Sequence, residues 1–221
     1  MSYRVAAAVE HTSLLSSLAC RTIVDVGANR GQFALVALRC QPSATIYSFE
    51  PLPEASRTLS SLFEENPAVV VHQAAVGPNR TVATMHVSRR DDSSSLLPIG
   101  STQAAVFPGT EEASTQRVSV APLTDFLSAQ EIQQPALLKL DVQGFELLAL
   151  QGCEALLSHF KYVYVECSFV ELYIGQPLAK EVIDWLRARE LGLAGIYNLV
   201  CGAQGRSIQA DFFFVREAPR N

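Results

Sequence analysis

The sequence predicts an α/β protein with a seven-stranded, mostly parallel sheet, helices on both of its faces and an antiparallel pair of strands at its end. Three observations predict this class. Short β-rich runs alternate with helical patterns from Arg21 to Phe63, a glycine-rich turn follows the first run, and the last two runs are joined by a short loop that contains glycine. Alternating runs are typical of parallel strands with crossover helices, whereas a short loop joins antiparallel strands.

Seven runs are expected to form strands, namely residues 22–26, 45–49, 69–72, 137–141, 162–166, 196–199 and 211–215. Apolar residues at helical spacing predict the helices between them. These are the segment from the glycine turn to residue 40 and residues 53–63, 144–150 and 177–190. Pro53 stands where a helix can begin, and Gly152 is expected to close the third helix.

Length and composition predict one domain over residues 1–221, because 48% of the 221 residues are hydrophobic and can bury a core. Residues 1–20 are expected to form a helical extension. The net charge of −5 is the wrong sign for a surface that binds phosphates, so no nucleic-acid partner is expected. Apolar runs fall far short of the ~20 residues of a membrane span, and no secretory signal is visible, so a cytoplasmic location is expected.

The five cysteines are odd in number and scattered, with no C-x-x-C pair. This spacing indicates neither a disulfide framework nor a zinc site, and all five are expected to be buried as small apolar residues. No dense cluster of carboxylates is visible either, so no metal is expected. The oligomeric state stays open at this point, and a homo-oligomer is compatible with the sequence.

The character of the chain changes after Thr81. An alternating run leads into a charged and serine-rich stretch at 89–95, which is followed by Gly, Pro, Ser and Thr up to about Gln116. Structureless segments longer than ~12–15 residues inside a compact domain are usually functional lids or disordered. Residues 89–116 are therefore predicted to be a lid-like excursion that faces the substrate.

The turn after the first strand reads D-x-G-x-x-x-G from Asp25 to Gly31 and lacks the G-x-G-x-x-G spacing of a dinucleotide site. Its glycines allow a sharp turn and a close approach of a ligand, and Asn29 can adopt the left-handed conformation. Asp25, at the carboxyl end of its strand, suits an amine better than a pyrophosphate, and Glu50, at the end of the next strand, can accept both hydroxyls of a ribose. A nucleoside with an amino-acid portion and no phosphates fits both acids.

That ligand is S-adenosylmethionine, and the sequence resembles the FkbM family of class I methyltransferases. The resemblance extends from Thr22 to Arg216 and rests on DVGANRGQF at 25–33, FEP at 49–51, DSSSL at 92–96, LTDFL at 123–127 and, most specifically, LKLDVQGFE at 138–146. It implies a Rossmann-like fold, S-adenosyl-L-methionine as cofactor, and methyl transfer to oxygen on sugars or hydroxylated natural products. One residue departs from the family pattern, because Gln143 stands where the family usually has Glu.

The glycine turn and the resemblance together indicate a set of cofactor-binding residues. They are Asp25, Gly27, Asn29, Gly31, Phe33, Glu50, Pro51 and Ala75. For the methyl acceptor, a small molecule with a hydroxyl group, the expected contacts are Ser94, Ser95 and Tyr173, of which Tyr173 could form an aromatic wall.

Lys139 and Asp141 are two residues apart in a predicted strand, so their side chains project from the same face near its carboxyl end. Glu166 ends the neighbouring strand, and open α/β sheets bind ligands at this edge. We therefore predict Asp141 as the base or as the group that orients the acceptor, with Lys139 keeping it ionised and Glu166 gripping substrate or cofactor. The alternative is a structural salt-bridge network. His86 is the spare candidate for the base.

Two other functions share parts of this pattern. A nicotinamide-dependent oxidoreductase would also have a strand, a glycine turn, a helix and a distal acid, but it requires a glycine where Asn29 stands. A non-catalytic binding module could keep the fold without the chemistry. The leading prediction is an S-adenosylmethionine-dependent O-methyltransferase.

Overall fold

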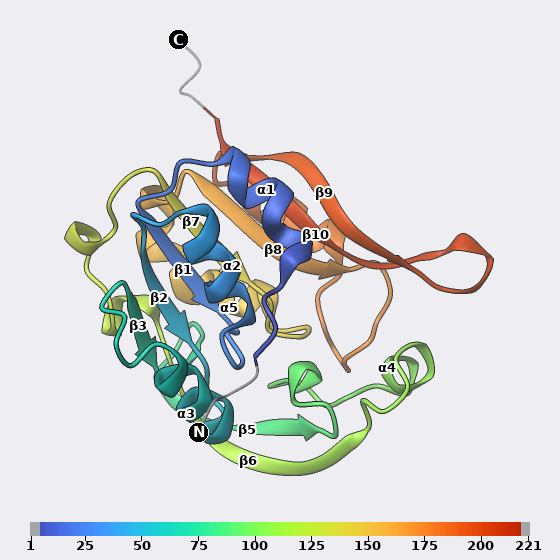
Figure 1. Ribbon diagram of the computed structural model, residues 1–221. Helices are drawn as coiled ribbons and strands as arrows, with labels where there is room; N and C mark the ends of the chain where they lie inside the picture. Colours follow the sequence, from blue (N-terminus) through green and yellow to red (C-terminus); the bar gives the residue numbers. More distant parts are fainter. Residues whose placement is uncertain (1–4, 218–221) are drawn as a thin grey trace.

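The computed structural model describes residues 5–217, with the exception of the side chains of Asp91 and Gln204. Its main sheet has seven strands in the order β3-β2-β1-β7-β8-β10-β9 (Figure 1). The strands are β1 (Thr22–Val26), β2 (Thr45–Phe49), β3 (Val69–His72), β7 (Ala136–Leu140), β8 (Tyr162–Ser168), β9 (Leu191–Cys201) and β10 (Ser207–Arg216). All pairs are parallel except those that β10 makes with β8 and β9. The predicted fold class is confirmed.

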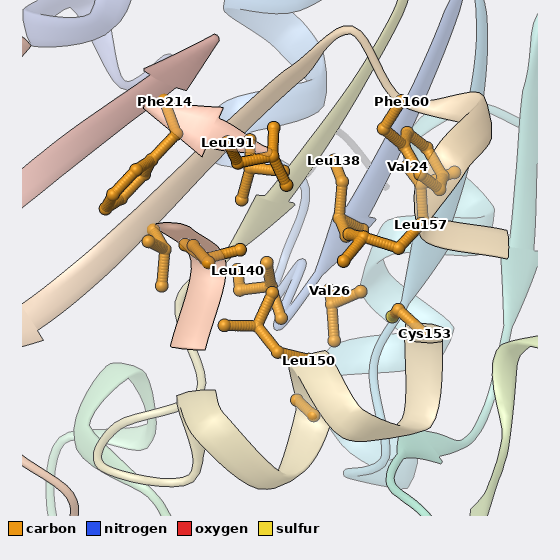
Figure 2. Close-up of a cluster of buried hydrophobic side chains, with 14 of the residues drawn as sticks. Val24, Val26, Leu138, Leu140, Leu150, Cys153, Leu157, Phe160, Leu191 and Phe214 are labelled. Atoms are coloured by element: carbon orange, nitrogen blue, oxygen red, sulfur yellow. The ribbon is translucent and has the colours of Figure 1, made fainter. Parts of the chain in front are cut away.

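Helices cover both faces of this sheet (Figure 1). One face packs against α1 (Thr12–Ser17), α2 (Gln32–Cys40) and α3 (Pro53–Leu62), whereas the other packs against α5 (Glu146–Cys153) and α6 (Ala179–Arg187). Figure 2 shows the second core, in which side chains of β1 and β7 such as Val24 and Leu138 point toward Leu150 and Leu157. Among the described residues, no helix is long and apolar enough to cross a lipid bilayer.

The face of the main sheet that packs against α1 and α2 changes from apolar to charged along β1 and β7. Its first residues are apolar, such as Ile23 and Leu137, and are fully buried. Two residues further along the same strands, Asp25 and Lys139 lie side by side in the parallel register. Because alternate residues of a strand share a face, the charged side chains collect at the carboxyl ends of the strands, on one face. This edge of the sheet is where the sequence predicts the functional site.

A second sheet of three strands, in the order β4-β6-β5, lies beyond the carboxyl ends of β1 and β2 (Figure 1). It consists of β4 (Ala75–Val76), β5 (Thr81–Ser88) and β6 (Glu112–Ala121). The segment 89–116 is thus more regular than its composition indicates, since it contains α4 (Ser101–Val106) and the first half of β6. The two ends of the segment lie close together because β5, which precedes it, pairs with β6 in an antiparallel register that places Ser88 opposite Glu112. Its role as a lid stays a prediction.

Two glycines explain where helix predictions were wrong. Helix α5 begins at Glu146 and not at Gly144, because Gly144 has a φ of +95° and follows Gln143 at +56°. Gly152 does not close α5 but lies within it, where a Cβ would come within 2.6 Å of the backbone of Gly77. Gly152 is therefore the place where α5 packs closely against the backbone of Gly77. The prediction of five buried cysteines is also wrong, since Cys201 is exposed on β9, an edge strand.

The predicted N-terminal extension has a short 3₁₀ helix at Val9–His11 and then α1. Residues 1–4 of that extension, and residues 218–221 of the predicted domain, lie outside the described residues.

Candidate active site

The turn after β1 is shaped by a close backbone approach. Gly27 has a φ of +81°, and a Cβ on it would lie 1.9 Å from the carbonyl oxygen of Asp141. No other residue fits there, so the turn after β1 can press against the end of β7. Asn29 adopts a φ of +46°, which confirms the left-handed conformation predicted for it.

Glu50 follows β2 directly, and its carboxylate is fixed by the same turn. Its Oε2 accepts a hydrogen bond from the Asn29 N–H at 2.9 Å, and its Oε1 accepts one from the Leu52 N–H at 2.7 Å. The side chain is buried, yet it lines a cavity. A carboxylate oxygen has two lone pairs, so Glu50 can still accept hydrogen bonds from a ligand in a fixed direction.

Lys139 stands between two carboxylates. Its Nζ lies 3.0 Å from Asp25 Oδ1 and 3.9 Å from Asp141 Oδ2, and it also donates a hydrogen bond to the Gly27 carbonyl at 3.1 Å. Burial alone would lower the pKa of Lys139, but Asp25 and Asp141 raise it above its ordinary value. The two carboxylates therefore favour the charged form of Lys139, which is buried at the cavity wall.

The structure gives Asp25 a different partner from the one the sequence predicts. Asp25 is fully buried and does not line the cavity, and its counter-ion is Lys139. Burial raises the pKa of Asp25, and the Lys139 ammonium opposes that shift. A ligand amine therefore does not meet this carboxylate directly, because the charge is neutralised inside the protein.

Of the two acids beside Lys139, Asp141 is the one that reaches the cavity, with 37% of its side chain exposed. The amide of Gln143 holds it from behind, since Nε2 donates to Asp141 Oδ1 at 2.6 Å and to Glu166 Oε2 at 3.0 Å. Tyr173 donates its hydroxyl proton to Gln143 Oε1 at 2.8 Å. Glu166 and Tyr173 thus support Asp141 through Gln143 and do not line the cavity themselves.

Glu166 also differs from its predicted role. Burial raises its pKa well above the ordinary value, and the charge of Asp141 adds to the shift. Its second oxygen accepts a hydrogen bond from Gln209 Nε2 at 2.9 Å. With partners on both oxygens, Glu166 belongs to the scaffold beneath the site.

The serines divide between the cavity and its support. Ser94 lines the cavity, and its Oγ accepts a hydrogen bond from the Ser88 N–H at 3.1 Å. Ser95 is buried and donates to the Gln143 carbonyl at 2.6 Å, which keeps it out of the cavity. His86, the spare base, does not line the cavity either and contacts Glu112, with 2.6 Å between Nδ1 and Oε2.

The cavity has a volume of about 390 Å³, which is in the range of small-molecule sites. Of the predicted residues it brings together Gly27, Asn29, Phe33, Glu50, Pro51, Ala75, Ser94, Lys139 and Asp141. Gly31 is absent from the wall because its Cα faces α3, where a Cβ would lie 2.7 Å from Leu59. Apolar residues complete the wall, among them Leu52, Val76, Met85, Leu96 and Phe145.

Sequence reasoning missed one whole wall of the cavity. Ala6, Ala7, Ala8, Glu10 and His11 line it, all from the segment before α1. The Ala8 N–H donates to the Gln32 carbonyl at 3.1 Å, which fixes this segment beside α2. The signals here were weak, since a run of alanines and a lone histidine are typical of helix and surface.

Residues 25–192 match the methyltransferase FkbM domain. The chain belongs to the FkbM methyltransferase family. The match begins at Asp25 and ends within β9, so it covers both the glycine turn and the Lys139–Asp141 strand. The predicted resemblance is confirmed, and S-adenosyl-L-methionine is the cofactor.

Curated relatives of this FkbM methyltransferase are named as methyltransferases. The chain is 26% identical over 180 residues to the 2-O-methyltransferase NoeI of Sinorhizobium fredii, covering 76% of this chain and 72% of that protein. It is 28% identical over 145 residues to the hexuronic acid methyltransferase AglP of Haloferax volcanii, covering 64% of this chain and 54% of AglP. The second match therefore spans about half the length of the relative.

Solved structures show the same fold at low identity. A precorrin-6y C5,15-methyltransferase of Geobacter metallireducens superposes with a TM-score of 0.53 at 9% identity, over 98% of this chain and 93% of that one. A putative tRNA methyltransferase of Streptococcus pneumoniae, in complex with S-adenosyl-L-methionine, superposes with a TM-score of 0.52 at 10% identity, over 96% of this chain and 74% of that one. These likenesses show the fold of the FkbM methyltransferase.

The cavity fits the cofactor on its own geometry. Gly27 leaves the turn bare of a side chain, Glu50 offers a fixed carboxylate for a ribose, and the apolar wall suits an adenine ring. Among the described residues, no group of three or more His, Cys, Asp or Glu side chains could hold a metal ion.

Glu146 provides a test of the electrostatics beside the site. Its Oε1 accepts hydrogen bonds from the Val142 and Gly144 N–H groups at 3.2 and 3.0 Å, and burial raises its pKa from 4.5 to about 7. Because the folded state binds this proton more tightly than the unfolded state, the stabilisation is complete below pH 4.5 and is lost as the pH rises through 7.

Glu146→Gln keeps the accepting oxygen and stays neutral. We expect it to flatten the fall in the free energy of unfolding between pH 4.5 and 7.5 and to raise that free energy at pH 8 by about 1–3 kcal/mol. Urea unfolding over a pH series measures this. An unchanged slope would show that Glu146 does not titrate as its burial requires.

Proposed function

We propose that this FkbM methyltransferase transfers the methyl group of S-adenosyl-L-methionine to a hydroxyl group of a sugar, a glycoside or another small natural product. The observation that carries the proposal is the position of Asp141. A partly exposed carboxylate, paired with the buried cation Lys139, lines the same cavity as the ribose-binding candidate Glu50. An acceptor hydroxyl beside the cofactor can donate its proton to this carboxylate.

The cofactor, when bound, supplies a methyl group that its sulfonium already activates. The protein has to align the acceptor and remove its proton. Glu50 holds the ribose hydroxyls, Gly27 and Asn29 line the backbone cradle, and Phe33, Pro51 and Ala75 form its walls.

Asp141 accepts the proton of the acceptor hydroxyl, and the Lys139 ammonium lies 3.9 Å from Asp141 Oδ2 and attracts its carboxylate. The Gln143 amide orients the carboxylate, because its hydrogen bond to Asp141 Oδ1 leaves Oδ2 for the acceptor. Ser94 stands on the excursion at the same cavity and contacts the acceptor. The segment 89–116 covers the acceptor as a lid.

The named relatives support the acceptor class. NoeI is named a 2-O-methyltransferase, which indicates methyl transfer to oxygen. AglP is named a hexuronic acid methyltransferase, which indicates a sugar acid as the acceptor. The nicotinamide-dependent alternative loses its support, because the family match covers the glycine turn on which it depended.

The experiment is a screen of acceptors with methyl-labelled S-adenosyl-L-methionine. The panel contains methyl glycosides of neutral hexoses, 6-deoxyhexoses and hexuronic acids, together with matched deoxy sugars that lack one hydroxyl. We expect label on at least one glycoside, and loss of label when the methylated hydroxyl is absent. Label that persists on every deoxy analogue, or transfer to amines alone, would contradict the proposal.

Glu50→Ala tests the cofactor half of the proposal. We expect S-adenosylhomocysteine to bind 1.5–3 kcal/mol more weakly, about 10- to 150-fold, because hydrogen bonds to a charged group are lost. Glu50→Gln should lose less, since it keeps one accepting oxygen. Calorimetry measures both affinities, and Glu64→Ala, an exposed residue of the loop after α3, is the matched control. Unchanged affinity in Glu50→Ala would remove Glu50 from the site.

A further inference from the structure

His11 lies on the cavity wall and is held by a chain of hydrogen bonds that the mechanism above does not use. Its Nδ1 lies 3.1 Å from the Tyr164 hydroxyl, which donates to Asp211 Oδ2 at 3.0 Å. Asn198 Nδ2 donates to the same Asp211 oxygen at 2.7 Å and lies 3.3 Å from the Tyr164 hydroxyl. The chain joins the segment before α1 to β8, β9 and β10.

These contacts determine where the imidazole carries its proton. The Tyr164 hydroxyl has one proton, and Asp211, as a carboxylate, only accepts, so that proton points to Asp211. The Tyr164 oxygen must then accept from His11 Nδ1–H. Asn198 Nδ2 also lies 3.4 Å from His11 Nδ1, but its two protons already have closer partners in Asp211 and Tyr164. His11 Nε2 is left as a hydrogen-bond acceptor.

The ring is fixed in this orientation, and its burial favours the neutral form. It lies edge-on to Phe33 and Tyr164, with ring centroids 5.3 and 5.5 Å apart, and only 13% of its side chain is exposed. Burial lowers the pKa of His11 despite the opposing charge of Asp211. A neutral imidazole with Nδ1 protonated presents a lone pair at Nε2.

Glu10 supplies a second acceptor beside it. Glu10 Oε1 lies 3.7 Å from His11 Nε2, and both residues line the cavity. Two acceptors cannot bond to each other, so a donor between them is favoured. A hydroxyl has one proton and satisfies only one acceptor, whereas an ammonium group has three and carries the charge that Glu10 attracts.

We propose that Glu10 and His11 bind the α-ammonium group of the cofactor's amino-acid portion, with Tyr164 and Asp211 as positioning residues for the His11 ring. This inference rests on the proposed function. It assigns to the segment before α1 the contact that the sequence predicted for Asp25, whose charge Lys139 neutralises. The segment thus closes the cavity around the end of the cofactor that carries the amine.

The test compares two ligands that share the adenosine. S-adenosylhomocysteine has the amino-acid portion, and 5′-methylthioadenosine lacks it. We expect Glu10→Gln to weaken S-adenosylhomocysteine about 3- to 10-fold, because the carboxylate is 54% exposed and partly screened, and His11→Gln to weaken it about 10-fold. Neither variant should change the affinity for 5′-methylthioadenosine by more than about twofold.

Tyr164→Phe separates positioning from fold. Without the hydroxyl, His11 can exchange its tautomer and turn an N–H toward the ammonium. This variant should therefore lower the affinity for S-adenosylhomocysteine and not the affinity for 5′-methylthioadenosine, although Tyr164 does not line the cavity. His159→Gln is the control for His11→Gln, since His159 does not line the cavity. Melting temperatures of all variants verify that each folds.

Each outcome decides the inference. The inference is supported if the Glu10 and His11 variants bind S-adenosylhomocysteine more weakly while their affinity for 5′-methylthioadenosine is unchanged. Equal losses for both ligands, or unchanged affinities with a raised KM for the acceptor, would overturn it, the latter by assigning the pair to the acceptor. If the unaltered chain binds neither ligand, the proposed function fails together with the inference.

Discussion

Asp141→Asn is expected to lower turnover about 10²- to 10⁴-fold while the affinity for S-adenosylhomocysteine stays nearly unchanged, because the loss is that of a general base. Asparagine retains the oxygen that accepts the Gln143 amide proton at 2.6 Å, so the local geometry survives. Only the charge that receives the acceptor proton is removed. Steady-state kinetics on an acceptor from the screen, together with calorimetry, separate the two effects.

Asp184→Asn is the matched control for this variant. Asp184 lies on α6 in an exposed pair with Lys180, away from the cavity, and its loss should leave turnover within twofold. Near-normal turnover of Asp141→Asn on a true acceptor would show that Asp141 is structural. His86 would not then take its place, because it does not line the cavity.

Lys139→Met is expected to destabilise the fold by about 3–5 kcal/mol, which is the usual result of removing one partner of a buried ion pair. Asp25 is fully buried, and its carboxylate is paired with the Lys139 ammonium at 3.0 Å, so Lys139 is the group that compensates its charge. Turnover should fall as well, since Asp141 loses the neighbouring cation at 3.9 Å. Chemical denaturation measures the free energy of unfolding.

The double variant Asp25→Asn/Lys139→Met tests the cause. Removing both charges leaves no fully buried carboxylate without a cation, because the Asp141 side chain is 37% exposed, so most of the lost stability should return even though turnover does not. A loss below about 1 kcal/mol in Lys139→Met, or a double variant as unstable as the single one, would contradict the assigned role of the pair.

The strands and the acids at their ends could be predicted because their signals are local. Each of the parallel strands is a short apolar run, and Glu50 and Asp141 directly follow such runs. Topology then brings strand ends together at one edge of the sheet. The left-handed Asn29 is also a local property of its turn.

What the sequence did not reveal depends on pairing across the fold. The register of β1 with β7 places Lys139 beside Asp25 and takes that acid out of the cavity, which no local pattern of charges indicates. Residues 89–116 contain part of a strand whose partner, β5, precedes the segment. The alanines before His11 line the site only because the chain returns past α2.

The measurement that tests the central claim most directly is calorimetric binding of S-adenosylhomocysteine and NAD to the purified chain. The cavity carries a fixed carboxylate for a ribose, further carboxylates at Glu10 and Asp141, and no dinucleotide turn, so it repels a pyrophosphate. We expect S-adenosylhomocysteine to bind and NAD to show no heat of binding. Tighter binding of NAD than of S-adenosylhomocysteine would contradict the account.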